Sequence, residues 1–349
     1  MPNTYFTSGR LIILRPLLWL LLLAAVLGSL RIGSYPVSTA DVLRTLWAWV
    51  CGQTTPTSPS VNDVSQVVVL TLRLPRVLIA TLVGAGLGMS GTALQAVMRN
   101  PLVGPDLVGV SAGAACGGVL AMLFDMPPIG VVALAFLFGF AALALTAVLA
   151  RPVRTGGALA IVLAGVFVGA FFTAVLGMIE YTADAETQLP GMVYWLLGSF
   201  AEADRRKLLI LFVPTVVGGV LLMRLRWRIN LLSLGELDAV TLGTNTSRLR
   251  WGIILLVSCV VAAQVSVSGV VPWIGLLVPH LTRMLVGPDH RRLLPAAALI
   301  GALLMLLVDD LARTLAAQEI PVGLITAILG TPAIGYLFWK NQVRGWINE

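Results

Sequence analysis

The chain has 349 residues, of which 58% are hydrophobic and 11% are charged. This composition excludes a soluble globular protein and a disordered chain, and it indicates a protein that crosses a membrane many times. The formal net charge of +7 is typical of membrane proteins, whose cytoplasmic loops collect Lys and Arg, so we do not take it as a sign of nucleic-acid binding.

Uncharged apolar runs predict about ten transmembrane helices, because about 20 helical residues cross the hydrocarbon core of a bilayer. We place them at 11–30, 77–98, 107–124, 128–150, 158–179, 208–223, 251–268, 271–286, 293–308 and 321–339. No small-x-small cleavage site follows Leu30, so we expect the first run to be a retained helix and not a secretory signal. The expected fold is an all-α polytopic bundle in which residues 1–349 form a single transmembrane domain.

The distribution of basic residues predicts the orientation of the bundle. If both termini lie in the cytoplasm, about two thirds of the 23 Lys and Arg residues fall on the cytoplasmic side, in agreement with the positive-inside rule. We therefore expect cytoplasmic N- and C-termini. The basic residues left on the outer side require a separate explanation.

Two polar segments interrupt the apolar pattern. The outer one, 31–76, contains a possible amphipathic helix at 39–50 and a Thr/Pro/Ser-rich connector at 54–60. The inner one, 224–250, contains Ser233-Leu234-Gly235-Glu236, which fits a capping box, and a glycine at 243 where a helix C-terminus is expected. These signals predict a helix of two to three turns on the inner face, and a purely structural connector is the alternative.

The sequence restricts the source of energy for transport. A phosphate-binding loop requires Gly-Lys-Ser/Thr, and neither Lys207 nor Lys340 follows a glycine, so the chain is not itself an ATPase. An ion-coupled carrier usually keeps ionisable groups at mid-membrane depth. The few found here, such as Asp309 and Asp310, lie near the ends of predicted spans and are expected to reach the interface.

Residues for other chemistry are sparse. The only histidines are His280 and His290, with no HExxH motif, and no acidic dyad accompanies them. The cysteines, Cys51, Cys116 and Cys259, follow neither a disulfide pattern nor a metal-ligand spacing. We expect no catalytic residue and no metal site.

A series of motifs runs in order from about residue 70 to about residue 340. They are Arg73-Leu74-Pro75-Arg76, Ser90-Gly91 with Gln95, Arg99-Asn100-Pro101-Leu102, Gly109 with Gly113, Trp273 to His280 with Arg283, Gly287 to Arg292, Asp309 with Arg313, and Glu319 to Gly323. Together they resemble the permease subunits of ABC importers for iron chelates, haem and vitamin B12, which are type II importers.

This resemblance implies an architecture and a set of partners. The permease would dimerise with a second copy or a related permease around one translocation path, and two ATPase subunits would bind its inner face. Those ATPases would hold ATP and Mg, and this chain would bind no cofactor. A periplasmic or lipid-anchored substrate-binding protein would deliver the substrate. The expected location is the bacterial inner membrane, in contact with its lipid.

The substrate implied by the resemblance is a ferric siderophore. Haem and cobalamin are alternatives, because generic Gly, Ala, Ser, Thr and Leu residues along the path do not discriminate between chelates. An ion-coupled secondary transporter is the alternative from another class. In each case the chain would be a transport subunit and not an enzyme.

The resemblance also implies a coupling helix at 231–243, which would fit into a cleft of the ATPase and transmit its closure. The candidate coupling residues are Ser233, Leu234, Gly235, Glu236, Leu242 and Gly243. A cytoplasmic gate is implied as well, in two loops of small and polar residues. Its candidate residues are Asn100, Pro101, Leu102, Thr155 and Gly156.

The outer arginines match family positions for docking of the substrate-binding protein. Arg73, Arg76 and Arg313 would pair with acidic residues on its lobes, contributing more to orientation and association rate than to affinity. Snorkelling of arginines that merely end a helix is the alternative. Asp310, at a position that is usually apolar in the family, could change the charge near Arg313.

Overall fold

The computed structural model describes residues 8–33, 35–52, 64–151 and 157–346, and within these ranges it is built of helices without a β-strand. The helices are α1 (Ser8–Ser29), α2 (Thr39–Val50), α3 (Val64–Val67), α4 (Leu74–Met98), α5 (Val110–Leu123), α6 (Pro128–Ala150), α7 (Gly157–Thr182), α8 (Leu189–Leu196), α9 (Arg205–Leu234), α10 (Glu236–Thr241), α11 (Thr246–Ser268), α12 (Ile274–Val286), α13 (His290–Thr314) and α14 (Val322–Trp346). A π-helical segment, η1 (Val68–Arg73), joins α3 to α4, and a 3-10 segment, η2 (Pro105–Val108), precedes α5.

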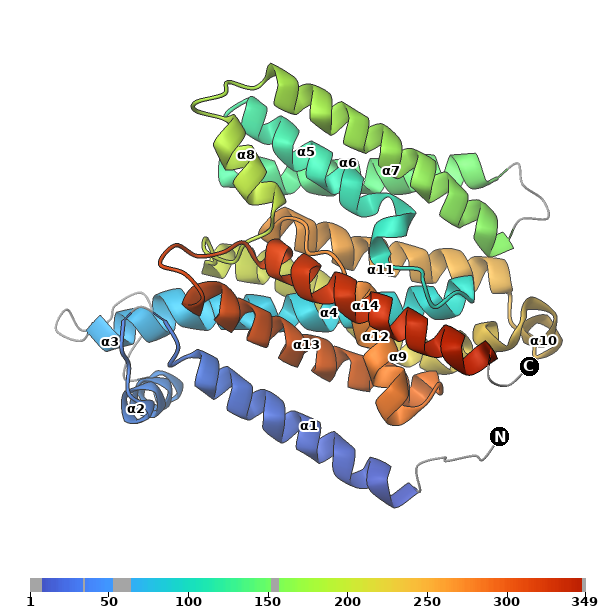
Figure 1. Ribbon diagram of the computed structural model, residues 1–349, viewed down its shortest axis with the longest axis horizontal. Coiled ribbons are helices and arrows are strands. Elements are labelled where there is room, and N and C mark those ends of the chain that lie inside the picture. Colours follow the sequence, from blue (N-terminus) through green and yellow to red (C-terminus); the bar gives the residue numbers. More distant parts are fainter. Residues whose placement is uncertain (1–7, 34, 53–63, 152–156, 347–349) are drawn as a thin grey trace.

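Apolar helices correspond to all ten predicted spans. Six are long and apolar enough to cross a membrane: the continuous α3 to α4 helix, α6, α7, α9, α11 and α13. Shorter apolar stretches in α1, α5, α12 and α14 match the other four. The long helices run along the horizontal of Figure 1, with α10 at one end and α2 and α3 at the other. We call these the α10 end and the Arg76 end, the latter after an arginine near the start of α4.

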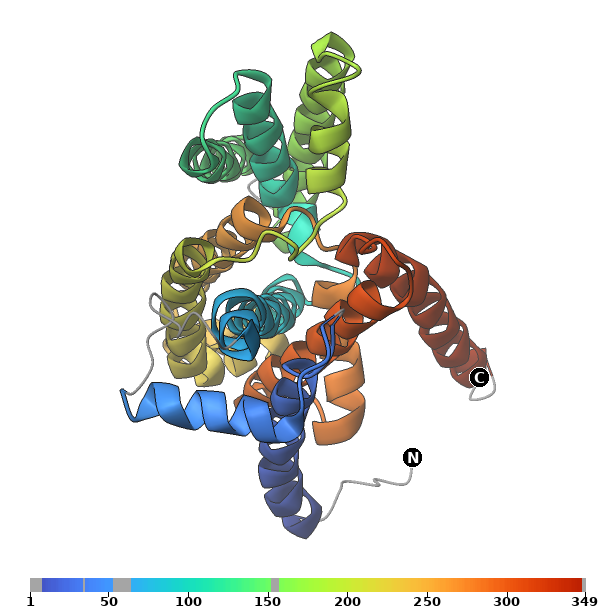
Figure 2. The same cartoon turned by 90° about the vertical axis from the view of Figure 1, so that its left-hand side faces the viewer.

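Helix α4 forms the centre of the bundle. Most of its residues are buried, and α9, α11, α12 and α13 surround it (Figure 2). Glycines permit the closest approach, because a Cβ on Gly84 would lie only 2.1 Å from the carbonyl oxygen of Gly301 in α13. One turn further along α4, Gly88 faces Ala297 in the same way.

Two groups of helices flank this centre. Helices α5, α6 and α7 pack together on one side and contact α11 and η2, at the top of Figures 1 and 2. Helix α1 packs along α13 on the opposite side, at the bottom of both views. The space between α1 and α9 therefore borders both α4 and α13.

The loops of the Arg76 end contain one predicted and one unpredicted helix. The amphipathic helix at 39–50 is confirmed as α2, which begins after Ser38, whose Oγ accepts the backbone N–H of Asp41 at 3.1 Å. The connector at 54–60 lies outside the described residues.

Helix α8 was not predicted, and it follows a turn in which Asp184 accepts the backbone N–H of Thr187 at 2.7 Å. This turn, with the Thr187 hydroxyl as a further donor, holds the pKa of Asp184 below its usual range.

Candidate functional site

Buried arginines gather around one carboxylate at the Arg76 end. Arg76 of α4 binds Oδ1 of Asp309 in α13 through Nε at 3.0 Å and Nη2 at 2.9 Å. Its Nη1 donates to both carboxylate oxygens of Glu319 at 2.8 Å. On the other side of the Asp309 carboxylate, Nε of Arg313 lies 3.2 Å from Oδ2. The fully buried Asp309 side chain thus links the two arginines.

The same cluster holds the chain segment between α1 and α2. Nη1 of Arg73 donates to the carbonyl oxygens of Leu30 and Arg31, each at 2.9 Å. Nη1 of Arg313 donates to the carbonyl oxygen of Ile32 at 2.8 Å. These bonds satisfy backbone acceptors beyond the end of α1, so the arginines fix the segment between α1 and α2 to η1 and α13.

The carboxylates of this cluster balance its arginines. Arg313 pairs with Asp310 as well as with Asp309, and Asp310 also accepts the hydroxyl of Ser29 at 2.7 Å. Asp309 lies near the end of α13, and its side chain is 0% exposed, so it is surrounded by the protein and not by water. Its negative charge is compensated by two guanidinium groups in place of water, which is the condition for burying a carboxylate.

The fold brings the three predicted docking residues into this single cluster. Their guanidinium groups are occupied within the chain, and Arg73 and Arg76 are only 6% and 7% exposed. Glu319 is the solvent-accessible member, with 40% of its side chain exposed. The docking role of Arg73, Arg76 and Arg313 stays a prediction.

At the opposite end, a short helix follows α9. Gly235 turns the chain from α9 into α10 with φ +151° and ψ 161°, a conformation that is essentially restricted to glycine. Beyond α10, Gly243 has φ +76° and its N–H donates to the carbonyl oxygen of Val240 at 2.9 Å. The predicted glycine cap is confirmed, whereas the helix has six residues, fewer than the expected two to three turns.

The predicted capping box is wrong. Ser233 lies in the last turn of α9, and its hydroxyl donates to the carbonyl oxygen of Asn230 at 2.6 Å. Because α9 continues past Ser233, Gly235 takes the N-cap position of α10, without a side-chain cap. The Asn230 side chain accepts the backbone N–H of His290 at 3.2 Å, so this end of α9 is tied to the start of α13.

Helix α10 presents apolar side chains outside the bundle. Val240 and Leu242 are 57% and 61% exposed, while Ala239 is buried against the bundle. The helix lies beyond the ends of the long helices in Figure 1. The coupling roles of the residues in 231–243 stay predictions.

The first predicted gate loop lies at the same end. Oδ1 of Asn100 accepts the backbone N–H of Leu102 at 2.9 Å, which forms a turn, and Asn100, Pro101 and Leu102 are all exposed. The chain then enters the bundle, where Pro105 packs so closely on Gly275 that a Cβ there would lie 2.5 Å from Cδ of the proline. The second loop, Thr155 and Gly156, lies outside the described residues, and the gate stays a prediction.

Sequence reasoning missed the carboxylates that pair with Arg76. Asp309 and Glu319 were recognised as parts of motifs but not as partners of Arg76. A signal was available, because an ionisable residue inside a membrane helix usually pairs with another. Arg76 begins one span, and Asp309 ends another that runs in the opposite direction, so both lie at the same face.

Comparisons with known proteins agree with this architecture. The model of the FecCD transport family matches residues 21–340. The molybdate import system permease MolB of Haemophilus influenzae is 43% identical, over 95% of this chain and 96% of its own length. The hemin transport system permease HmuU of Yersinia pestis is 41% identical, over 92% and 93%. A solved inward-facing metal-chelate type ABC transporter is 42% identical, with a TM-score of 0.82 over 93% of this chain and 97% of that one.

The matches extend over the whole bundle, including both ends described above. The family model covers most of the chain, and two relatives are more than 40% identical to it over more than 90% of its length. The chain therefore belongs to the FecCD transport family, as a permease subunit of an ABC importer.

Proposed function

We propose that this permease imports an iron chelate of the ferric siderophore type across the bacterial inner membrane. The observation that carries the proposal is the likeness, in sequence and over nearly the whole fold, to a metal-chelate type transporter. The hemin permease among its relatives supports a bulky iron-containing solute. Molybdate is the second candidate, because the molybdate permease MolB is 43% identical to this chain.

The α10 end is the cytoplasmic end in this proposal, and both termini lie there. Helix α10 would contact a separate ATPase, with Val240 and Leu242 as the apolar part of the contact. The exposure of Val240 and Leu242 and the position of α10 beyond the spans support this assignment. ATP and Mg would bind to the ATPase subunits, and two permease chains would enclose the path. Loop 100–102 would close that path at the cytoplasmic end.

A substrate-binding protein would dock at the Arg76 end. Arg76 and Arg313 already have carboxylate partners and Arg73 donates to backbone carbonyl groups, so docking through these arginines requires an exchange. Glu319 is suited to it, because it is partly exposed and, among the described residues, only Nη1 of Arg76 binds its carboxylate. A carboxylate of the binding protein would replace Glu319 on Arg76. The Arg76 guanidinium group would then bind the partner and the buried Asp309 at the same time.

Uptake of labelled substrates tests the proposed substrate. Cells that lack their own iron-chelate and molybdate importers would express this permease with its ATPase and binding protein, and would be given a ⁵⁵Fe-siderophore, ⁵⁵Fe-hemin, ⁵⁷Co-cobalamin or ⁹⁹Mo-molybdate. We expect accumulation of the ferric siderophore above a strain without the permease. Accumulation of molybdate alone would favour the second candidate, and accumulation of hemin or cobalamin alone would contradict the siderophore assignment.

A further inference from the structure

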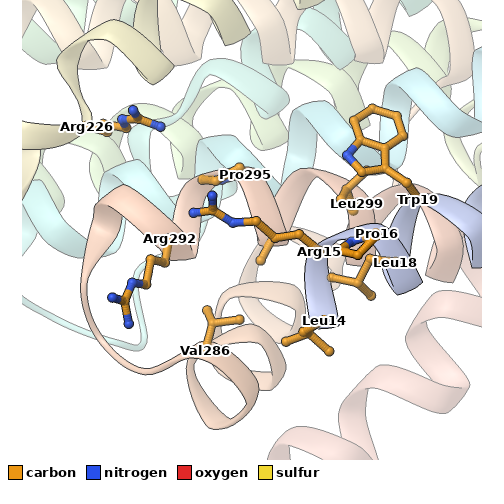
Figure 3. Close-up of a pocket in the computed structure, with 11 residues that line it drawn as sticks. Leu14, Arg15, Pro16, Leu18, Trp19, Arg226, Val286, Arg292, Pro295 and Leu299 are labelled. Carbon is orange, nitrogen blue, oxygen red and sulfur yellow. The ribbon is translucent and has the colours of Figure 1, made fainter. Parts of the chain in front are cut away.

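A pocket of about 670 Å³ opens between α1, α9, α12 and α13 near the α10 end. Three of its lining residues are arginines from three different helices: Arg15 of α1, Arg226 of α9 and Arg292 of α13. All three are exposed. In Figure 3 their guanidinium groups lie on one side of the pocket, and Trp19 and Leu299 lie on the other.

The pocket continues into a second cavity of about 730 Å³. The two share Trp19, Arg226, Pro295 and Leu299, so they form one groove along the side of the bundle. Apart from Thr81, Thr215 and two arginines, the second cavity is lined by apolar side chains and glycine from α1, α4, α9 and α13. We call the two cavities together the α1–α9 groove.

On each of α1, α9 and α13, the arginine lies nearer the α10 end of the groove and the apolar side chains lie further from it. On α1, Arg15 is followed by Trp19 and Leu22 on one face of the helix, and on α13, Arg292 is followed by Leu299. The apolar wall of α1 reaches about 10 Å beyond its arginine, at 1.5 Å per residue. Helix α9 runs in the opposite direction and places its apolar residues before Arg226. The groove is thus cationic at the α10 end and apolar towards the middle of the bundle.

The described residues supply no carboxylate partner to the arginines at this end of the groove. Among the described residues, no carboxylate forms an ion pair with Arg15, Arg226 or Arg292. The contrast with Arg76 and Arg313, which both pair with carboxylates, is clear. Arginine is well suited to bind phosphate, because its guanidinium group donates two parallel hydrogen bonds.

We propose that the α1–α9 groove binds a phospholipid with an anionic headgroup. Its phosphate lies between the three arginines, and an acyl chain follows the apolar wall towards Leu22 and Leu299. Basic pockets between membrane helices bind anionic headgroups for this reason. A free phosphate ion would use the arginines but not the apolar wall, and the groove lies at the depth of the spans, where lipid is the natural neighbour. The proposal is independent of the transported substrate.

Tryptophan fluorescence can test the site, because Trp19 lines both cavities and is 62% exposed. The purified full-length permease in neutral detergent is titrated with phosphatidylglycerol or phosphatidylcholine, each with brominated acyl chains. The same titration of Trp19→Phe subtracts the signal of the other tryptophans. We expect phosphatidylglycerol to quench Trp19 at a concentration about a hundredfold lower than phosphatidylcholine, because the contributions of three arginines near an anionic headgroup add up. Inorganic phosphate should not displace the brominated phosphatidylglycerol.

Two triple variants separate the site from general charge. Arg15→Gln/Arg226→Gln/Arg292→Gln should bind the two lipids with affinities within about threefold of each other, since Arg224 of the second cavity is the one groove arginine that remains. The control Arg151→Gln/Arg248→Gln/Arg291→Gln removes as many charges from the same end, outside the groove, and should keep the preference. If one triple variant does not fold, the comparison of lipids on the unmodified permease still decides. Four results would overturn the proposal. The first two are equal quenching by both lipids and displacement of the brominated lipid by inorganic phosphate. The others are loss of the lipid preference in the control variant and a Trp19 that a second copy of the permease shields from both lipids.

Discussion

Replacing Arg76 with methionine should destabilise the isolated permease by about 3–5 kcal/mol, the usual effect of removing one partner of a buried ion pair. The variant leaves the fully buried Asp309 with Arg313 alone and releases Glu319. Methionine keeps much of the side-chain volume, so the loss reports the charge and not a cavity. The measurement is the free energy of unfolding in detergent, without a binding protein, so that docking does not contribute.

The matched control is Arg44→Met, at an arginine of the same end of the bundle. Arg44 is 83% exposed, and its nearest carboxylate, on Asp41, lies 4.0 Å away. Its removal should cost less than about 1 kcal/mol. In the double variant Arg76→Met/Asp309→Asn, the neutral amide needs less compensation, so part of the lost stability should return. Equal stability of Arg76→Met and Arg44→Met would show that the Arg76 cluster does not hold the outer loops and spans together.

Replacing Gly235 with alanine should uncouple transport from ATP hydrolysis. A Cβ is strained at φ +151°, so the junction between α9 and α10 must change and α10 is reoriented. An added Cβ would meet only the Asp238 carboxylate, at 3.4 Å, so the amount of folded permease should remain close to normal. We expect ATP-driven uptake to fall about tenfold, which corresponds to roughly 1.4 kcal/mol of lost coupling, while the assembled complex keeps its basal ATPase activity.

Gly252→Ala is the control for this variant. Gly252 lies within α11, has nothing within 4 Å of an added Cβ and needs no positive φ, so alanine should be accepted there. Uptake by Gly235→Ala at the level of Gly252→Ala would contradict a coupling role for α10. A parallel loss of folded permease and uptake would assign Gly235 to folding alone.

The sequence predicted the spans well where apolar composition and helix length coincide. Helix α6 occupies the predicted range 128–150, because Pro128 begins it and Arg151 follows it. Helix α9 was predicted to end at 223 but continues to Leu234, since Arg224 and the arginines after it are good helix formers outside the hydrocarbon. The edge of the bilayer limits the apolar run and not the helix. Helix α8 has eight residues, so a search for apolar runs long enough to cross a membrane does not detect it.

The sites were predicted less completely, because they depend on contacts between distant segments. The motifs identified Arg73, Arg76 and Arg313, but not their partners. Arg76 pairs with Asp309 and Glu319, more than 200 residues away, and Arg73 binds the segment between α1 and α2. The α1–α9 groove could not be predicted at all, since its arginines lie on three separate helices. Gly235 was recognised in a motif, but only the fold reveals that it, and not Ser233, is the N-cap residue of α10.

The requirement for a separate ATPase is the central claim, and transport into proteoliposomes tests it most directly. The permease would be reconstituted with its substrate-binding protein outside, and uptake measured with or without the ATPase and enclosed ATP, under an imposed proton or sodium gradient. We predict uptake only when both the ATPase and ATP are present, whatever the gradient. Uptake driven by a gradient in vesicles that contain this chain alone would contradict the account.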